Sequence, residues 1–264
     1  MTDDRMPLSR RAFLPSSVLA SSLFLLAAGA APSTHRPRAA QPIARLGVPG
    51  WMALHQSFLD KPDRKTAELL LVGDSITQDL LRAGPLPQQD MRPVWNRFYA
   101  PRKALNIGIS GDTTANLLWR LRNGEIDGIT PKVAQLLIGA NNFGYAHWNA
   151  ADTLAGIEAN IDELRRRLPR TKIILLSVLP SRRSKWADLN TLAVNRSLAA
   201  RYRPGNAVHY VDVTAAFHRN GALDPDAFYD GALQPPAPLL HPSQAGWTRM
   251  AEMVEPTLAA LMAR

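Results

Sequence analysis

The sequence contains no cysteine among its 264 residues. The protein therefore forms no disulfide, and it has no thiolate for catalysis, for zinc or for an iron–sulfur cluster. Long hydrophobic runs are also scarce, because the uncharged stretch 18–31 is shorter than the ~20 residues that a membrane-spanning helix needs. The chain has no internal repeat. Neither the G-x-x-x-x-G-K-[ST] nucleotide loop nor the G-x-S-x-G elbow occurs, which excludes a P-loop protein and disfavours an ordinary α/β-hydrolase.

Residues 1–30 have the order of a secretory signal peptide. Residues 9–14 have the sequence SRRAFL, the apolar stretch follows, and Ala-Gly-Ala at 28–30 offers a cleavage site. The arginine pair predicts twin-arginine export to the periplasm or the medium, and an ordinary Sec signal is the alternative. No cysteine follows the apolar stretch, so a lipoprotein anchor is excluded. Residues 31–45 are rich in Pro, Ala and Arg without periodicity, which predicts a flexible linker before a domain over 46–264.

The chain is basic, with 31 Lys and Arg against 22 Asp and Glu and a net charge of +9. Cleavage after Ala30 removes three arginines and two acidic residues, which leaves +8. The basic cluster over 165–172 ends a predicted helix, where cations complement the helix dipole, and no aromatic residues interleave it. We therefore expect no nucleic-acid partner. The charge could instead draw the protein to anionic polysaccharide or phospholipid surfaces.

Short apolar runs alternate with amphipathic stretches along the rest of the chain. Near-continuous apolar runs that alternate with helices are typical of a parallel sheet covered on both faces. The runs lie at 68–72, 104–109, 133–138, 173–179 and 208–213, and the helical patterns lie at 51–59, 114–123, 153–167, 189–200 and 244–262. The pattern predicts one α/β domain, a three-layer α/β/α sandwich with a flavodoxin-like, doubly wound parallel sheet of about five strands.

Four polar motifs fall where ligands bind in such sheets, at the carboxyl ends of the strands or before the last helix. Ser75 lies in GDSIT after the first strand, where its hydroxyl can be exposed, although it could simply cap a helix. Gly111 lies in NIGISGDTT after the second strand, where two glycines allow close backbone approach, or a tight turn. Asn141 lies in IGANN after the third strand and could donate to an oxyanion, or be a turn residue. His241 precedes the last helix, in the place that a general base needs, although a lone histidine is more often structural.

Together and in this order, the four motifs resemble the SGNH, or GDSL, hydrolase family over about residues 51–262. The resemblance is strongest to the branch of the platelet-activating-factor acetylhydrolase catalytic subunits, through NIGISGDTTANLLWRLRNGEI, PKVAQLLIGANN and KIILLSVLP. It implies a serine esterase with Ser75 as nucleophile and His241 as base. The N–H groups of Ser75 and Gly111 and the amide of Asn141 would form the oxyanion hole. The resemblance implies neither a metal nor an organic cofactor.

One motif departs from the family pattern. The family has an acidic residue three positions before the histidine, and here that position is Pro238. We expect Asp230 to be the triad acid, separated from His241 by a proline-rich insertion that loops back. The alternatives are Asp226, Asp224 or a Ser–His dyad that uses a backbone carbonyl.

For the substrate, the sequence indicates a class of ester. The resemblance favours short-chain O-acyl esters, acetyl first, and an exported enzyme favours a carbohydrate as the acyl carrier. A lysophospholipase or thioesterase, or a catalytically impaired glycan-binding module, are the alternatives. Four tryptophans, Trp95, Trp119, Trp148 and Trp247, could stack on a sugar, but core packing is the favoured explanation for each. The resemblance also allows a homodimer, and no membrane anchor is expected after signal cleavage.

Overall fold

The apolar runs form the strands of one parallel sheet, as predicted. The computed structural model describes residues 1–2, 36–203 and 207–263. The strands are β1 Leu69–Gly73, β2 Ala104–Asn106, β3 Val133–Leu137, β4 Lys172–Leu176 and β5 Val208–Val211. They pair in the order β2-β1-β3-β4-β5, and every pair is parallel. This is the flavodoxin-like order, which confirms the predicted fold class.

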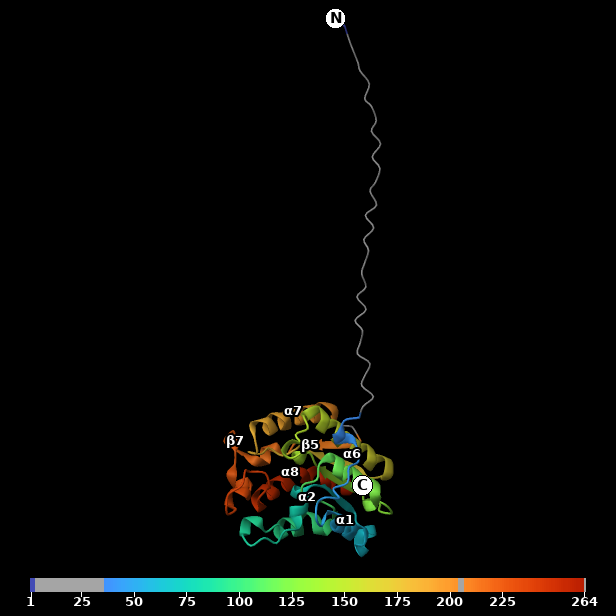
Figure 1. Ribbon diagram of the computed structural model, residues 1–264, viewed down its shortest axis with the longest axis vertical. Coiled ribbons are helices and arrows are strands. Elements are labelled where there is room, and N and C mark those ends of the chain that lie inside the picture. The colour runs from blue at the N-terminus through green and yellow to red at the C-terminus, as the bar shows by residue number, and fades with distance from the viewer. Residues whose placement is uncertain (3–35, 204–206, 264) are drawn as a thin grey trace. The chain divides into compact units, whose positions relative to one another are not determined.

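Helices cover both faces of the sheet (Figure 1). One face carries α4 Thr114–Arg120, α6 Ala150–Arg167 and α7 Lys185–Arg201, which pack against one another in that order. The other face carries α8 Gln244–Met262, which contacts β3, β4, β5 and the short α3 Arg92–Val94. The remaining helices are α1 Trp51–Leu59, α2 Ser75–Gln78 and α5 Ala140–Gly144, and a small hairpin pairs β6 His218–Arg219 with β7 Ala222–Leu223.

The helices begin where polar caps accept hydrogen bonds from free N–H groups. Thr113 and Asn116 form a reciprocal capping box at the start of α4. Asn149 caps α6, Ser184 caps α7 and Ser243 caps α8. The start of α8 therefore follows His241 after two residues, which holds the histidine close to a fixed point of the fold.

The segment 36–45, which we call the N-terminal strap, corrects the predicted linker. Ala39 and Ala40 are buried where a 3₁₀ turn packs against α4 and α6. Ala39 accepts a hydrogen bond from the Thr114 hydroxyl at 2.8 Å, and Ile43 donates from its N–H to the Ala115 carbonyl at 3.0 Å. Small side chains and backbone hydrogen bonds attach the strap, so its sequence has no apolar periodicity, and this led to the prediction of a linker. Apart from residues 1–2, the expected signal peptide and residues 31–35 lie outside the described residues.

The strap belongs to the same structural unit as the sheet, which spans residues 36–264. Gly156 on α6 permits the close approach, since a Cβ there would lie 2.6 Å from the Ala39 carbonyl oxygen. Within the described ranges, no helix is long and apolar enough to cross a membrane.

Candidate active site

The end of β1 presents Ser75 at the edge of the sheet. β1 ends at Gly73, where a Cβ would lie 2.3 Å from the Leu137 carbonyl oxygen, so only glycine allows the two strands to run so close here. Asp74 then caps α2 by accepting a hydrogen bond from the Ile76 N–H at 3.0 Å. Ser75 follows as the first residue of α2. The strand-to-helix turn therefore fixes the direction of the serine side chain.

Three side chains form a continuous hydrogen-bonded row, which we call the Ser75–His241–Asp230 row. Ser75 Oγ lies 3.0 Å from His241 Nε2, and His241 Nδ1 lies 2.7 Å from Asp230 Oδ1. The second carboxylate oxygen of Asp230 accepts hydrogen bonds from the N–H groups of Leu240 at 2.7 Å and His241 at 2.5 Å. A serine hydroxyl, an imidazole and a carboxylate in this sequence are the groups that activate a serine for nucleophilic attack.

The proline-rich insertion brings Asp230 to the histidine, as the sequence suggested. Its chain folds back on itself, since the Ala237 N–H donates to the Asp230 carbonyl at 3.0 Å and the Tyr229 N–H to the His241 carbonyl at 3.1 Å. The rival acids are engaged elsewhere. Asp224 binds Arg249 and Arg219, and Asp226 binds Arg219.

The surroundings of His241 favour its charged form. Burial by itself lowers the pKa of His241, but the hydrogen bond and negative charge of Asp230 outweigh it, and the pKa is raised. The carboxylates of Asp79 and Asp74 act in the same direction. The ring of Tyr229 stacks on the imidazole with centroids 5.6 Å apart, which restricts the orientation of the histidine.

The predicted oxyanion donors follow the two strands that neighbour β1. Because β1 lies between β2 and β3, the segments that follow β2 and β3 bring Gly111 and Asn141 to the same edge of the sheet as Ser75, and the Asn141 amide lies 3.1 Å from the carbonyl of Asp112, the residue after Gly111. Gly111 has φ +77°, a conformation that favours glycine. Among the described residues, no acceptor is bonded to the N–H of Ser75 or of Gly111. The Asn141 amide donates to the Asp112 carbonyl at 3.1 Å and also lies within hydrogen-bond distance of the Asp74 carboxylate, and these two contacts orient the side chain.

Asp74 is a buried carboxyl group next to the nucleophile. Burial raises its pKa to about 7, and the hydrogen bond from Ile76 and the charge of His241 only partly offset this. The Asn141 amide also lies 3.5 Å from its second oxygen. The geometry gives Asp74 a capping and positioning role, because its oxygens face α2 and Asn141.

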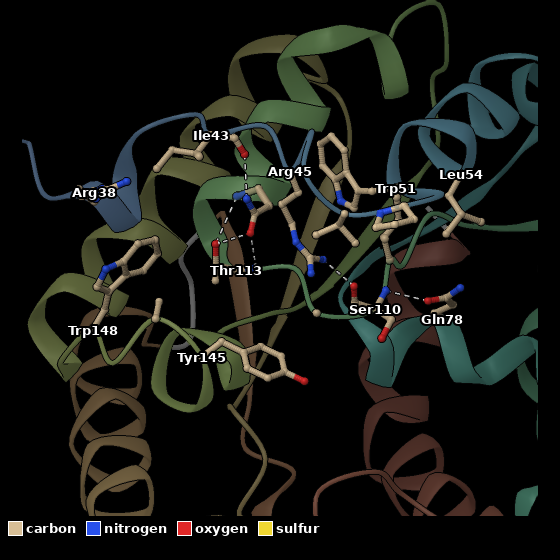
Figure 2. Close-up of a pocket in the computed structure, with 16 residues that line it drawn as sticks. Arg38, Ile43, Arg45, Trp51, Leu54, Gln78, Ser110, Thr113, Tyr145 and Trp148 are labelled. Atoms are coloured by element: carbon tan, nitrogen blue, oxygen red, sulfur yellow. Dashed lines mark hydrogen bonds between the residues drawn. The ribbon is translucent and has the colours of Figure 1, made fainter.

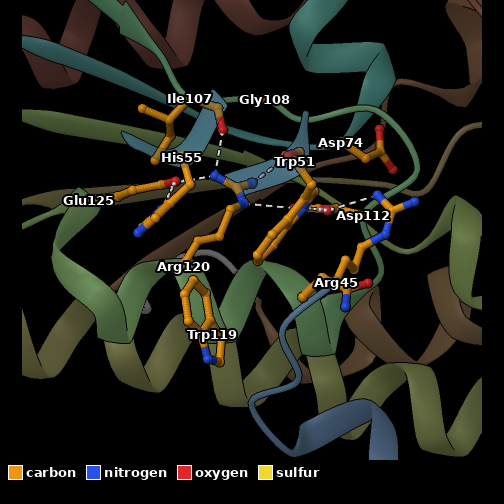
Figure 3. A network of polar contacts seen from close by, with 12 residues as sticks. Arg45, Trp51, His55, Asp74, Ile107, Gly108, Asp112, Trp119, Arg120 and Glu125 are labelled. Carbon is orange, nitrogen blue, oxygen red and sulfur yellow. Dashed lines mark hydrogen bonds and ion pairs between the residues drawn. The ribbon is translucent and has the colours of Figure 1, made fainter. Parts of the chain in front are cut away.

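A buried ionic network, which the sequence analysis missed, supports the loop that carries Gly111 (Figure 3). The guanidinium of Arg120 on α4 donates to Asp112 at 2.7 Å, to Glu125 and to the carbonyl of Ile107 at 2.8 Å. It also donates to the Gly73 carbonyl at 3.2 Å, so one side chain links the ends of β1 and β2. The one sequence signal was a charged residue in the otherwise largely apolar stretch 115–121.

The strap and α1 complete this network. Arg45 of the strap donates to the Ser110 carbonyl at 2.7 Å and pairs with Asp112 at 3.2 Å. Trp51 donates from its indole N–H to the same Asp112 oxygen at 2.7 Å, and His55 Nδ1 lies 2.8 Å from Glu125. The guanidinium of Arg45 lies so close to Gly111 that a Cβ there would approach it to 2.7 Å. The strap therefore holds the loop of the predicted oxyanion hole from outside.

A groove of about 610 Å³ opens beside this loop (Figure 2). Its walls are the strap, the start of α1, the loop over 109–113 and the loop over 145–148. Gly111 lies in its wall, so the groove begins at the predicted oxyanion hole. Trp148 also lines it, whereas Trp247 is buried in the core, so the four tryptophans do not share one role.

Within the described residues, no group of three His, Asp or Glu side chains is placed to hold a metal ion.

Comparisons with known proteins agree with the site. The GDSL-like lipase/acylhydrolase family profile matches residues 71–248. The human platelet-activating factor acetylhydrolase IB subunit alpha2 is 34% identical over 230 residues, which cover 86% of this chain and 90% of that protein. This confirms the predicted branch.

Solved structures share the fold. A GDSL-like lipase from Bacteroides thetaiotaomicron superposes with a TM-score of 0.59 at 21% identity, over 79% of this chain and 95% of that one. A carbohydrate acetylesterase from Sinorhizobium meliloti gives a TM-score of 0.53 at 13% identity, over 73% of this chain and 98% of that one. With the family match, these likenesses lead to one conclusion: this chain belongs to the GDSL-like lipase/acylhydrolase family of ester-cleaving enzymes.

Proposed function

We propose that this protein is an exported serine esterase that removes short acyl groups, acetyl first, from O-acylated carbohydrates. The observation that carries the proposal is the Ser75–His241–Asp230 row, with Gly111 and Asn141 in the segments that follow the two strands beside β1. These are the groups that acyl transfer through a serine requires.

The geometry supports a two-step reaction. His241 Nε2 takes the proton of Ser75 as Oγ attacks the ester carbonyl, and the N–H groups of Ser75, Gly111 and Asn141 stabilise the oxyanion. The carbon–oxygen bond to the alcohol breaks as His241 returns the proton to the leaving oxygen, and an acyl-serine remains. His241 then removes a proton from water, which attacks the acyl-serine and releases the acid and free Ser75. Asp230 holds the imidazole and stabilises its charged form throughout.

Two named relatives and the groove beside Gly111 support the acyl and alcohol preferences. The human relative is named an acetylhydrolase, and one protein of the same fold is named a carbohydrate acetylesterase. The groove beside Gly111 gives room for an alcohol larger than a simple alkyl group. The impaired binding module loses its sequence argument, because Asp230 contacts His241 despite the insertion.

Chromogenic esters test the reaction and the chain length together. We expect the mature protein to hydrolyse p-nitrophenyl acetate faster than the butyrate, with little activity on the palmitate. Ser75→Ala should abolish turnover, while Ser57→Ala, at an exposed serine on α1, should leave it unchanged. Activity retained by Ser75→Ala would contradict the mechanism. A preference for palmitate would favour a lipid hydrolase instead, and no hydrolysis of any ester would favour a binding module.

Export is proposed on the sequence of residues 1–30 alone. In a host with a twin-arginine system, the full chain should reach the periplasm, and replacement of Arg10 and Arg11 by lysine should retain it in the cytoplasm. Unchanged export of that double variant would indicate a Sec signal.

A further inference from the structure

The charged side chains that line the groove beside the oxyanion loop are all positive. Two of its lining residues are arginines, and among the described residues none that line it is aspartate or glutamate. One end of the groove lies at Gly111 and Ser110, next to the reacting centre, and the other lies at Arg38 and Trp148 (Figure 2). A substrate bound by its ester at Ser75 would therefore extend its alcohol part toward Arg38.

The two arginines of the groove differ in what they are bound to. Arg45 is tied to the Ser110 carbonyl and to Asp112, so its charge is largely offset by a carboxylate. Arg38 is exposed, and in the part of the chain that the structure describes its guanidinium has no protein partner. A cation without a partner at the far end of a groove free of carboxylates favours an anionic ligand group there.

Aromatic rings line the same groove. Tyr145 has 68% of its surface exposed, although a tyrosine ring is largely apolar. The guanidinium of Arg183 lies 5.0 Å from the centre of this ring, which fixes its position and adds positive charge beside it. Trp148 is half-buried and shares its end of the groove with Arg38. Aromatic faces pack against the C–H faces of pyranose rings, whereas a simple short alcohol would leave them uncovered.

We propose that this groove binds the alcohol part of the substrate, and that this part is an acidic saccharide whose sugar ring packs on Trp148 while its carboxylate pairs with Arg38. The inference rests on the proposed esterase function and names the class of its acyl carrier. It assigns specificity to the strap, since Arg38 lies in a segment that the sequence indicated to be a linker.

A matched pair of substrates tests the proposal. Methyl glucuronide and methyl glucoside, each acetylated at the same hydroxyl, differ in a carboxylate against a hydroxymethyl group. We expect the wild type to have a kcat/KM about 1.5- to fivefold higher for the glucuronide, the size of one exposed ion pair. Arg38→Gln should remove this preference.

Arg36→Gln is the matched control, because Arg36 is exposed and two residues away but does not line the groove. It removes the same charge and should keep the preference. Trp148→Ala should lower kcat/KM for both sugars. No preference in the wild type, a preference that survives Arg38→Gln, or equal losses in the two arginine variants would overturn the proposal.

Two further outcomes separate this proposal from its alternatives. Acetylated glycerol 3-phosphate turned over faster than the glucuronide would overturn the saccharide assignment in favour of a phosphate headgroup. Failure of the wild type to cleave even p-nitrophenyl acetate would overturn the proposed function itself. A wild type that cleaves p-nitrophenyl acetate but does not prefer the glucuronide would overturn the subsite alone.

Discussion

Replacement of Arg120 by methionine removes the guanidinium that neutralises two buried carboxylates. The side chains of Arg120, Asp112 and Glu125 are all 0% exposed, so water cannot take over the role of the lost cation. Methionine keeps much of the length of the arginine stem, which limits the cavity that the change creates. The main consequence is therefore electrostatic, because Glu125 keeps only His55 as a side-chain partner.

The expected loss follows from the burial of this network. Removal of one member of a buried ion pair typically destabilises a protein by about 3–5 kcal/mol. Since a domain has only about 5–15 kcal/mol of stability in all, Arg120→Met should fold but with a small margin. At about 2–4 °C per kcal/mol for a domain of this size, its melting temperature should fall by roughly 6–20 °C.

Urea denaturation monitored by circular dichroism measures this loss, and Arg122→Met is the control. Arg122 is two residues away, 39% of its side chain is exposed, and its buried partner Glu163 also pairs with Arg166 and so keeps a cation. Its replacement should cost only about 0–1 kcal/mol. Adding Glu125→Gln to Arg120→Met should recover part of the stability, since Asp112 keeps Arg45 and Trp51. An Arg120→Met midpoint within error of the wild type would refute the reasoning.

Three further predictions concern the site and the strap. Asp230→Asn should lower kcat by about 10²–10⁴-fold. It should also move the acid limb of the pH profile of kcat/KM to lower pH, because Asp230 raises the pKa of His241 and only the neutral imidazole acts as base. An acid limb at the same pH as in the wild type would contradict this role. Asp74 has a pKa of about 7 in the folded protein against an ordinary value of 3.8, so the folded state binds more protons than the unfolded state between these two pH values. The free energy of unfolding should therefore fall as the pH rises across this window. It should fall less in Asp74→Asn, as denaturation at a series of pH values would show. A protein that starts at residue 46 should lose stability and esterase activity relative to one that starts at residue 36, because the strap binds α4 and the oxyanion loop; equal activities would contradict the positioning role of the strap.

The sheet could be predicted because its central strands, such as β1 and β3, are buried on both faces. Runs such as 68–72 and 173–179 have no polar alternation, and this pattern is typical of parallel strands between helices. The strand ends followed from the same runs, so the positions of Ser75, Gly111 and Asn141 were predictable once the sheet was. The acid was harder, because the proline-rich insertion breaks the usual spacing and only the folded loop distinguishes Asp230 from its rivals.

The strap and the ionic network could not be predicted for a different reason. Ala39 and Ile43 bind through backbone groups, which every residue carries, so no side-chain pattern records the contact. The pairing of Arg45 with Asp112 joins residues from distant parts of the chain. Such pairs follow from the fold, and a single sequence gives no periodicity from which to infer them.

The central claim is that Ser75 is the nucleophile of an esterase. Intact-mass spectrometry after treatment with a p-nitrophenyl phosphonate, followed by peptide mapping, tests it most directly. The account predicts one phosphonyl adduct per molecule, located on Ser75, with activity lost in proportion to labelling and no adduct on Ser75→Ala. Full labelling of a different residue, or full esterase activity in a protein labelled at Ser75, would contradict it.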